Sequence, residues 1–148
     1  MRTEFRKALM PGELRSLCTF DRKVFPSDHF SPADWRGYEA WWLVVNQRKI
    51  GCCAFETQDD GCLYISTTGI LPSFQRRGYG RLMKTWQLIY ARENGFQYIE
   101  THTRKSNVAM IALNKEFGFQ VSRTELGYYE DPRESAVVMR LELQRPTG

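Results

Sequence analysis

A short glycine-rich and basic segment, residues 75–80, has the residue types that bind phosphate groups. Gly78 and Gly80 carry no Cβ atom, so the main chain can come close to a bulky anion there. A β-rich run stops at Pro72 just before the segment, and an amphipathic pattern follows it. If a helix begins there, the N–H groups of its first turn and the positive end of its dipole favour a phosphate. The spacing therefore predicts an anion site, for a ligand that carries a pyrophosphate.

Four cations reinforce this prediction, and no acidic residue lies between positions 75 and 84. They are Arg76, Arg77, Arg81 and Lys84. A Walker loop would need Gly-x4-Gly-Lys followed by Ser or Thr, and a dinucleotide-binding fold would need Gly-x-Gly-x-x-Gly. Neither pattern occurs in the segment. A basic helix start without a ligand is the alternative that the segment alone leaves open.

The first half of the chain predicts a strand at 3–8, two helices and an antiparallel meander. Pro11 fits the first turn of one helix, and Ser31 fits the capping position of a second one that runs through Tyr38. The strands of the meander are expected at 41–45, 50–56 and 62–70, with turns at 46–49 and 59–61. The inward face of the first helix is predicted to carry Leu14, Leu17 and Cys18.

The second half predicts one βαβ unit, a further helix and a closing pair of antiparallel strands. A helix after Gly80 ends at the left-handed cap signal Asn94-Gly95, and the strand 96–103 returns parallel to 62–70 by a right-handed crossover. A helix at 107–117 and strands at 119–128 and 135–143 follow. The apolar faces of the two helices are expected to be Leu82, Trp86, Ile89 and Tyr90, and Val108, Ile111, Ala112 and Phe117.

Length and composition indicate one globular domain over residues 1–148, with 42% hydrophobic and 14% aromatic residues. The apolar runs are too short to cross a bilayer, and the N-terminus lacks a secretory core, so we expect a cytoplasmic protein that does not bind membranes. The cysteines at 18, 52, 53 and 62 have no metal-ligand spacing, and the chain has two histidines, so no metal site is expected. The net charge is +4, but the sequence does not interleave aromatic and basic residues in the way typical of nucleic-acid binding, so no nucleic-acid partner is expected.

Two segments together resemble the GNAT acetyltransferase superfamily. Residues 68–81 match its Gln-x-x-Gly-x-Gly coenzyme A loop, and residues 106–119 match its Asn-x-x-x-Ile-x-Leu-Tyr-x-x-x-Gly-Phe helix. The resemblance covers about residues 64–143. It implies an α/β (α+β) fold: a mixed, mostly antiparallel sheet of six or seven strands with helices on both faces. Its central parallel pair would be splayed for coenzyme A.

The resemblance also implies where the donor substrate, acetyl-CoA, would bind. The main chain of Thr68, Gly69 and Ile70 would pair with the pantetheine arm, and Gly69 also fits a β-bulge that opens a slot. Amides from residue 76 to residue 81 would hold the pyrophosphate, and Asn107 and Asn114 would contact the coenzyme. The full set of expected coenzyme residues is Thr68, Gly69, Ile70, Gln75, Arg76, Arg77, Gly78, Tyr79, Gly80, Arg81, Asn107 and Asn114.

Acetyl transfer needs a group that takes a proton from the amine, and the family position that often carries glutamate is Tyr64 here. His102 stands where other relatives carry glutamate, and an imidazole suits proton transfer at neutral pH. A polar strand-end histidine without catalytic duty is the alternative. Asn114 replaces the tyrosine that often protonates the leaving thiolate, so Tyr128, Tyr129 or water would substitute; aromatic packing explains Tyr128 and Tyr129 equally well.

The sequence thus predicts an N-acetyltransferase that moves an acetyl group from acetyl-CoA to a primary amine of a small molecule, protein or peptide by direct attack in a ternary complex. A catalytically weak coenzyme A-binding sensor or interaction module is the alternative. Four aromatics, Trp35, Tyr38, Trp41 and Trp42, fit either an acceptor wall or the core. The exposed closing strands would favour a homodimer, and the sequence leaves the oligomeric state and the amine open.

Overall fold

The computed structural model describes residues 2–143 and has the predicted element order. A short 3-10 turn, Pro72–Phe74, is the one addition among these residues. The elements are β1 Thr3–Lys7, α1 Leu14–Val24, α2 Pro32–Arg36, β2 Glu39–Val45, β3 Arg48–Thr57, β4 Cys62–Ile70, α3 Tyr79–Glu93, β5 Tyr98–Arg104, α4 Val108–Glu116, β6 Gln120–Tyr129 and β7 Glu134–Glu142.

The described strands form one seven-stranded sheet in the order β1-β2-β3-β4-β5-β7-β6. The pair β4 and β5 is parallel, with registered pairs from Cys62↔Tyr98 to Ile65↔Thr101. The pairs β1–β2, β2–β3, β5–β7 and β6–β7 are antiparallel. The predicted mixed, mostly antiparallel sheet is confirmed. Its order also shows what the sequence did not indicate: β7 lies between β5 and β6.

The chain divides into two compact units that share two elements. One unit contains the residues up to 56 and residues 66–83, and the other contains residues 57–65 and those from 84 onward. The strand β4 and the helix α3 therefore each contribute to both units. The single domain expected for residues 1–148 stays a prediction. Every helix among residues 2–143 is too short or too polar to span a bilayer.

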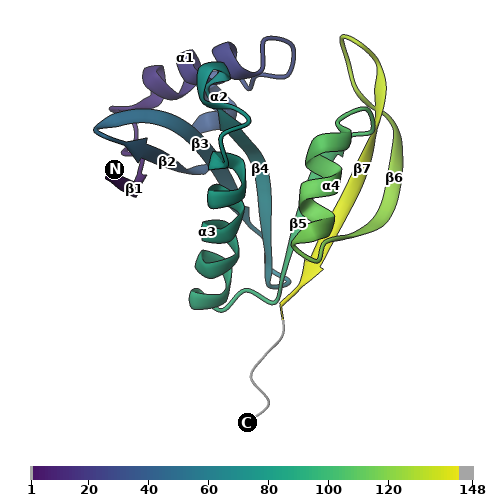
Figure 1. The fold of residues 1–148 in the computed structure, drawn as a ribbon. Coiled ribbons are helices and arrows are strands. Elements are labelled where there is room, and N and C mark those ends of the chain that lie inside the picture. The colour runs from purple at the N-terminus through teal and green to yellow at the C-terminus, as the bar shows by residue number, and fades with distance from the viewer. Residues whose placement is uncertain (1, 144–148) are drawn as a thin grey trace. The chain divides into compact units, whose positions relative to one another are not determined.

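In the first unit, α1 and α2 pack on β2 and β3 (Figure 1). The helix α1 begins at Leu14, three residues later than predicted, because residues 10–13 form a turn. Leu17 and Cys18 are buried as expected. The start of α2 is a capping box, in which Ser31 accepts from the Asp34 amide and Asp34 accepts from the Ser31 amide. Trp35 and Trp42 are both 1% exposed, so these two are core residues.

A buried carboxylate, Asp21, ties the parts of this unit together. It is 2% exposed, and its Oδ2 accepts from the Phe30 amide at 2.7 Å and from the Trp35 indole at 3.0 Å. Burial raises the pKa of Asp21, although these two hydrogen bonds act in the opposite direction. One oxygen therefore connects α1 with α2 and with the loop between them, and its charge costs folding free energy.

We expect Asp21→Leu to destabilise the fold by about 2–4 kcal/mol, because the half-buried Phe30 amide and the buried Trp35 indole N–H lose their acceptor. Asp21→Asn keeps an oxygen for both donors and removes the buried charge. Since the folded pKa is raised, ionisation costs stability as pH rises past the ordinary aspartate range, so the advantage of Asp21→Asn should grow with pH across that window. Urea unfolding at several pH values measures this. An Asn variant as unstable as the Leu variant would contradict the assignment.

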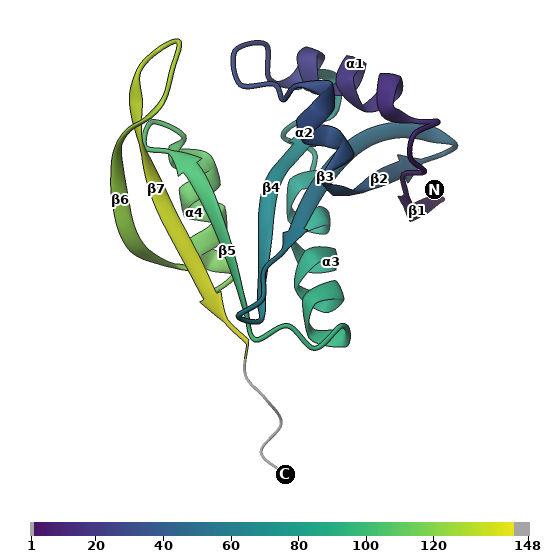
Figure 2. The ribbon, with the colours of Figure 1, turned by 180° about the vertical axis from the view of Figure 1, so that it is seen from behind.

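In the second unit, α4 covers one face of the strands β5, β7 and β6, as Figures 1 and 2 show from opposite sides. Alternation along β5 and β7 sorts their side chains between the two faces. Met139 lies on the α4 face, where it contacts Asn114. His102 and its registered partner Val138 lie on the other face, together with Glu100. A polar face thus forms on the side away from α4.

The buried faces of the helices α3 and α4 differ from the apolar faces that the sequence predicted. In α3, Leu82 and Ile89 are 37% and 46% exposed, while Lys84 and Gln87 are buried. In α4, Val108 is 72% exposed, and the residues that are buried or half-buried are Met110, Ile111, Leu113 and Asn114. The predictions counted apolar residues only, so buried polar side chains shifted the true faces away from them.

Candidate functional site

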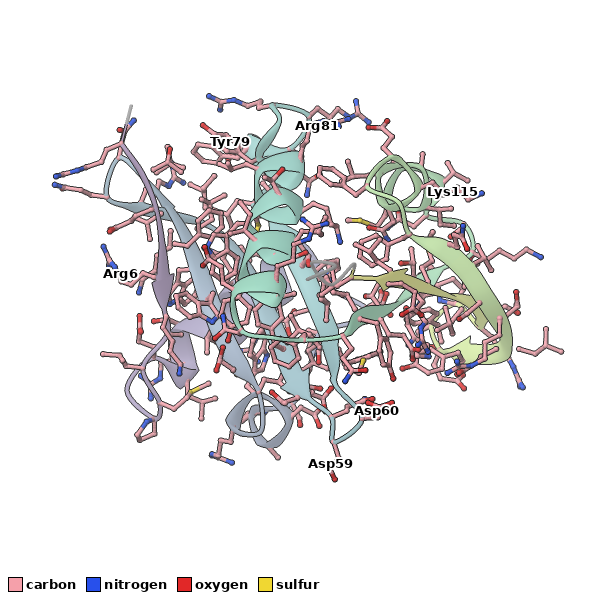
Figure 3. All side chains as sticks on the ribbon, turned by 90° about the horizontal axis from the view of Figure 1, so that it is seen from below. Arg6, Asp59, Asp60, Tyr79, Arg81 and Lys115 are labelled. Atoms are coloured by element: carbon pink, nitrogen blue, oxygen red, sulfur yellow. The ribbon has the colours of Figure 1, made fainter. Side chains whose placement is uncertain are left out.

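The segment that follows β4 forms the predicted turn into α3. The amide of Leu82 donates to the Gly78 carbonyl at 3.1 Å, so Gly78 caps the helix. In an α-helix the first-turn amides point toward the capping loop, here those of residues 79–81. Gly78 has φ +90°, and a Cβ atom built there would meet nothing within 4 Å. Figure 3 shows Tyr79 and Arg81 at this same end of α3. The helix start is therefore open to an anion.

The side chains of this loop are braced by their neighbours. Gln75 donates its side-chain amide to the Ile70 carbonyl at 2.9 Å, which fastens the loop to the end of β4. The guanidinium groups of Arg77 and Arg48 each lie 5.1 Å from the centre of the Phe74 ring. Arg76 is exposed and adopts a left-handed conformation with φ 62°. Lys84 instead is 2% exposed and its Nζ lies 5.0 Å over the Phe119 ring, so it differs from the exposed arginines of the loop; its part in the anion site stays a prediction.

Gly69 on β4 allows a close approach of α1. A Cβ atom built there would lie 3.0 Å from both Val24 and Phe25, which is too tight for an alanine to fit unless these side chains shift. The end of α1 thus packs directly on the strand that carries Thr68 and Ile70. This packing gives a physical reason for the glycine other than the predicted bulge, which stays a prediction.

Tyr64, His102 and Tyr128, the three predicted catalytic residues, meet on the polar face of the second unit. The Tyr64 hydroxyl lies 2.7 Å from His102 Nδ1. The Tyr128 ring stacks on the imidazole with centroids 4.4 Å apart. The His102 side chain is 11% exposed, whereas Tyr128 is 47% exposed. These three side chains come from β4, β5 and β6.

Glu125 completes this cluster, and the sequence did not point to it. Its Oε2 lies 3.3 Å from His102 Nε2. Arg123 holds its other oxygen, with contacts of 3.1 Å from Nε and 3.0 Å from Nη2, and also lies 3.7 Å from Glu100. Burial raises the pKa of Glu125, but its hydrogen bonds with Arg123 and His102 lower it by more. The carboxylate is therefore held charged beside the imidazole.

Arg104 fastens the hairpin that joins β6 and β7, next to the cluster. Its guanidinium donates to the carbonyls of Glu130 and Pro132 at 2.8 and 2.9 Å and to Glu134 at 3.0 Å. It also lies 4.5 Å over the Tyr129 ring. The hydrogen bonds from Ser106 and Arg104 lower the pKa of Glu134. Glu134 thus has a structural role in this hairpin.

The two asparagines predicted to contact coenzyme A occupy different environments in α4. Asn107 is exposed, and its side chain caps the helix by accepting from the Met110 amide at 3.2 Å. Asn114 is 0% exposed, and its amide donates to the Met139 sulfur at 3.6 Å. Its Oδ1 has no hydrogen-bond partner among residues 2–143. Residues 2–143 contain no group of three or more His, Cys, Asp or Glu placed to hold a metal ion.

Comparison with known proteins assigns the family. Residues 12–119 match the Acetyltransferase (GNAT) family. The N-alpha-acetyltransferase 50 of Danio rerio is 31% identical over 140 residues, which cover 88% of this chain and 83% of that protein. The ribosomal-protein-S18-alanine N-acetyltransferase of Escherichia coli has the same fold, with a TM-score of 0.86, 19% identity and 99% coverage of both chains. A GNAT family acetyltransferase from Elizabethkingia anophelis with acetyl-CoA bound also has this fold. Its TM-score is 0.83 at 14% identity, and the match covers 95% of this chain and 98% of that one. This chain belongs to the GNAT family of acetyltransferases.

Proposed function

We propose that this chain transfers the acetyl group of acetyl-CoA to the free α-amine of a protein or peptide, by direct attack of the amine in a ternary complex. The observation that carries the proposal is the 2.7 Å contact between the Tyr64 hydroxyl and His102 Nδ1, since it gives a GNAT acetyltransferase a group able to take a proton. The name of the Danio rerio relative supports an α-amine as the acceptor. A cytoplasmic location remains a prediction.

The first unit supplies most of the residues proposed to bind acetyl-CoA, while the coenzyme contacts of Asn107 and Asn114 in the second unit stay predictions. The pyrophosphate would accept from the first-turn amides of α3, with Arg76, Arg77 and Arg81 as counter-charges. The main chain of residues 68–70 would pair with the pantetheine arm. Gln75 would act indirectly, since its amide already holds the Ile70 carbonyl. Relatives of the same fold with acetyl-CoA or coenzyme A bound support this donor.

The second unit supplies the residues proposed to move protons. Tyr64 and His102 form a hydrogen-bonded pair through which the attacking amine would lose a proton, directly or through a water molecule. The buried Asn114 cannot donate a useful proton to the leaving thiolate, so Tyr128 or water would do so, or the thiolate would leave unassisted. The strand β4 carries residues of both proposed sets.

The alternative function is a coenzyme A-binding sensor or interaction module with weak catalysis. The specific observation in its favour is Asn114. It stands where the family often carries tyrosine, and its side-chain amide donates a hydrogen bond to the Met139 sulfur. Steady turnover of acetyl-CoA with an amine distinguishes an enzyme from such a module.

We expect acetyl-CoA to raise the melting temperature in proportion to ln(1 + [L]/Kd), because the folded loop alone presents its amides together. NADH and ATP should have far smaller effects. Differential scanning fluorimetry and calorimetry measure this directly. No shift and no heat at millimolar acetyl-CoA would end the proposal for the donor.

The acceptor is tested by mass spectrometry with three sets of amines: peptides bearing each of the twenty N-terminal residues, the same peptides with a blocked α-amine and an internal lysine, and small primary amines. We expect acetylation in the first set. Turnover restricted to the second or third set would overturn the proposed acceptor, and binding of acetyl-CoA without turnover in any set would favour the sensor.

A further inference from the structure

The His102 and Glu125 side chains meet across an intervening strand. His102 lies on β5 and Glu125 on β6, with β7 between them. The residues of β7 in register with these two are Val138 and Ala136, both short and fully buried. Because neither fills the space above the strand, the imidazole and the carboxylate approach to 3.3 Å. The contact therefore depends on two small residues as well as on its own two partners.

This contact determines which ring nitrogen carries the proton in a neutral imidazole. A carboxylate accepts hydrogen bonds only, so Nε2 facing Glu125 must be the N–H. Nδ1 is then an acceptor, and the Tyr64 hydroxyl at 2.7 Å is its donor. We propose that Glu125 is a positioning residue, which fixes His102 with Nε2 protonated and thereby leaves Nδ1 to receive the proton of Tyr64.

The orientation of the Glu125 carboxylate is itself fixed by a neighbouring residue. Arg123 makes two contacts with its Oε1, which leaves Oε2 for His102. The ionisable groups around the imidazole come from four strands: Tyr64 from β4, Glu100 and Arg104 from β5, Arg123, Glu125 and Tyr128 from β6, and Arg140 from β7, which is registered with Glu100. Among these, Glu125 is the carboxylate in contact with the ring, so an imidazolium formed there gains a direct counter-charge.

The inference rests on the proposed function, and it names the order of proton movement. The attacking amine gives its proton to the phenolic oxygen of Tyr64, while Tyr64 gives its own proton to Nδ1 of His102. The Nε2–H of the imidazolium continues to donate a hydrogen bond to the Glu125 carboxylate. When the ring returns its proton to Tyr64, which releases one to water, the starting state is restored. His102 thus acts through Tyr64, in agreement with its small exposure.

The first test uses NMR of the full chain with nitrogen-labelled histidine and no substrate. The chain has two histidines, so a His102→Gln variant assigns the signals. We expect the Nε2–H form of His102 in the wild type and a substantial Nδ1–H population in Glu125→Gln, whose amide can donate to Nε2. A wild-type ring with the proton on Nδ1, or identical His102 signals in Glu125→Gln, would overturn the inference even if the chain is an active enzyme.

The second test is kinetic, with the peptide that the acceptor screen acetylates best. We expect Glu125→Gln to lower kcat/KM about tenfold at neutral pH with KM for acetyl-CoA unchanged, because the ring would no longer be fixed with Nδ1 free to accept the proton of Tyr64. It should have no further effect in a His102→Gln background. Glu142→Gln, on an exposed side chain of β7, is the matched control and should leave kcat/KM unchanged. A kcat/KM equal to the wild type in Glu125→Gln, or an equal loss in both backgrounds, would refute the positioning role.

Discussion

The substitution Gly80→Glu is expected to raise the Kd for acetyl-CoA by about 100-fold or more while the protein stays folded. Gly80 lies in the first turn of α3 and is not among the glycines with positive φ, so a side chain is compatible with its backbone. Glutamate is a better helix former than glycine and is favoured near a helix N-terminus. Its carboxylate close to the pyrophosphate would cost on the order of 3 kcal/mol at 5 Å in a partly solvated site.

Gly80→Ala is the matched control, because it adds the Cβ atom without the charge and should weaken binding much less. Gly78→Glu should also weaken binding strongly, but it adds backbone strain, since Gly78 has φ +90°. Isothermal titration calorimetry gives Kd, and the melting temperature without ligand reports folding. Wild-type affinity in a folded Gly80→Glu protein would place the pyrophosphate elsewhere.

Removal of the imidazole in His102→Ala is expected to lower kcat/KM by about 100-fold or more, the usual scale for a general base. The acidic limb of the pH profile, where an imidazolium cannot accept a proton, should disappear with it. The alkaline side is shaped by the ionisation of the amine, so the acidic limb alone is diagnostic. Initial rates across pH with the best peptide acceptor measure both effects.

Tyr64→Phe tests the same pair from its other end, since it removes one hydroxyl and little volume. A comparable loss of kcat/KM is expected, with Kd for acetyl-CoA close to the wild type in both variants. If His102 were purely structural, His102→Ala would instead change the melting temperature of the protein and leave the acidic limb of the pH profile in place. If the limb survived in a folded, coenzyme-binding His102→Ala protein, the role would pass to water, Glu100 or Tyr64.

The element order, the mixed sheet and the family could be predicted from the sequence because each depends on local signals. Capping residues, turn glycines and alternation act over a few positions, and the two motifs lie within single connections. Gly95 and Gly118 both adopt the left-handed conformation expected after a helix. That Tyr64 and His102 lie on neighbouring strands also followed, since the crossover predicts the parallel pair, but their contact was not predicted.

Glu125 could not be predicted, because a bulge in β6 decides which face it occupies. Val121 is registered with Met139, but Arg123 is registered with Val138, so Ser122 is the extra residue. Without it, alternation would turn Glu125 to the face that α4 covers. The place of β7 between β5 and β6 is likewise a long-range pairing with no local signal. The burial of Lys84 against Phe119 also had no local signal, because the two residues are far apart in the sequence.

Arg104 has a consequence for how the hairpin between β6 and β7 can vary in sequence. Two of its hydrogen bonds reach main-chain carbonyls, those of Glu130 and Pro132. A carbonyl is present whatever side chain its residue carries, so substitutions at the tip of the hairpin do not remove these acceptors. The tip can therefore vary in sequence while it keeps its attachment to β5, as surface loops on a constant scaffold commonly do.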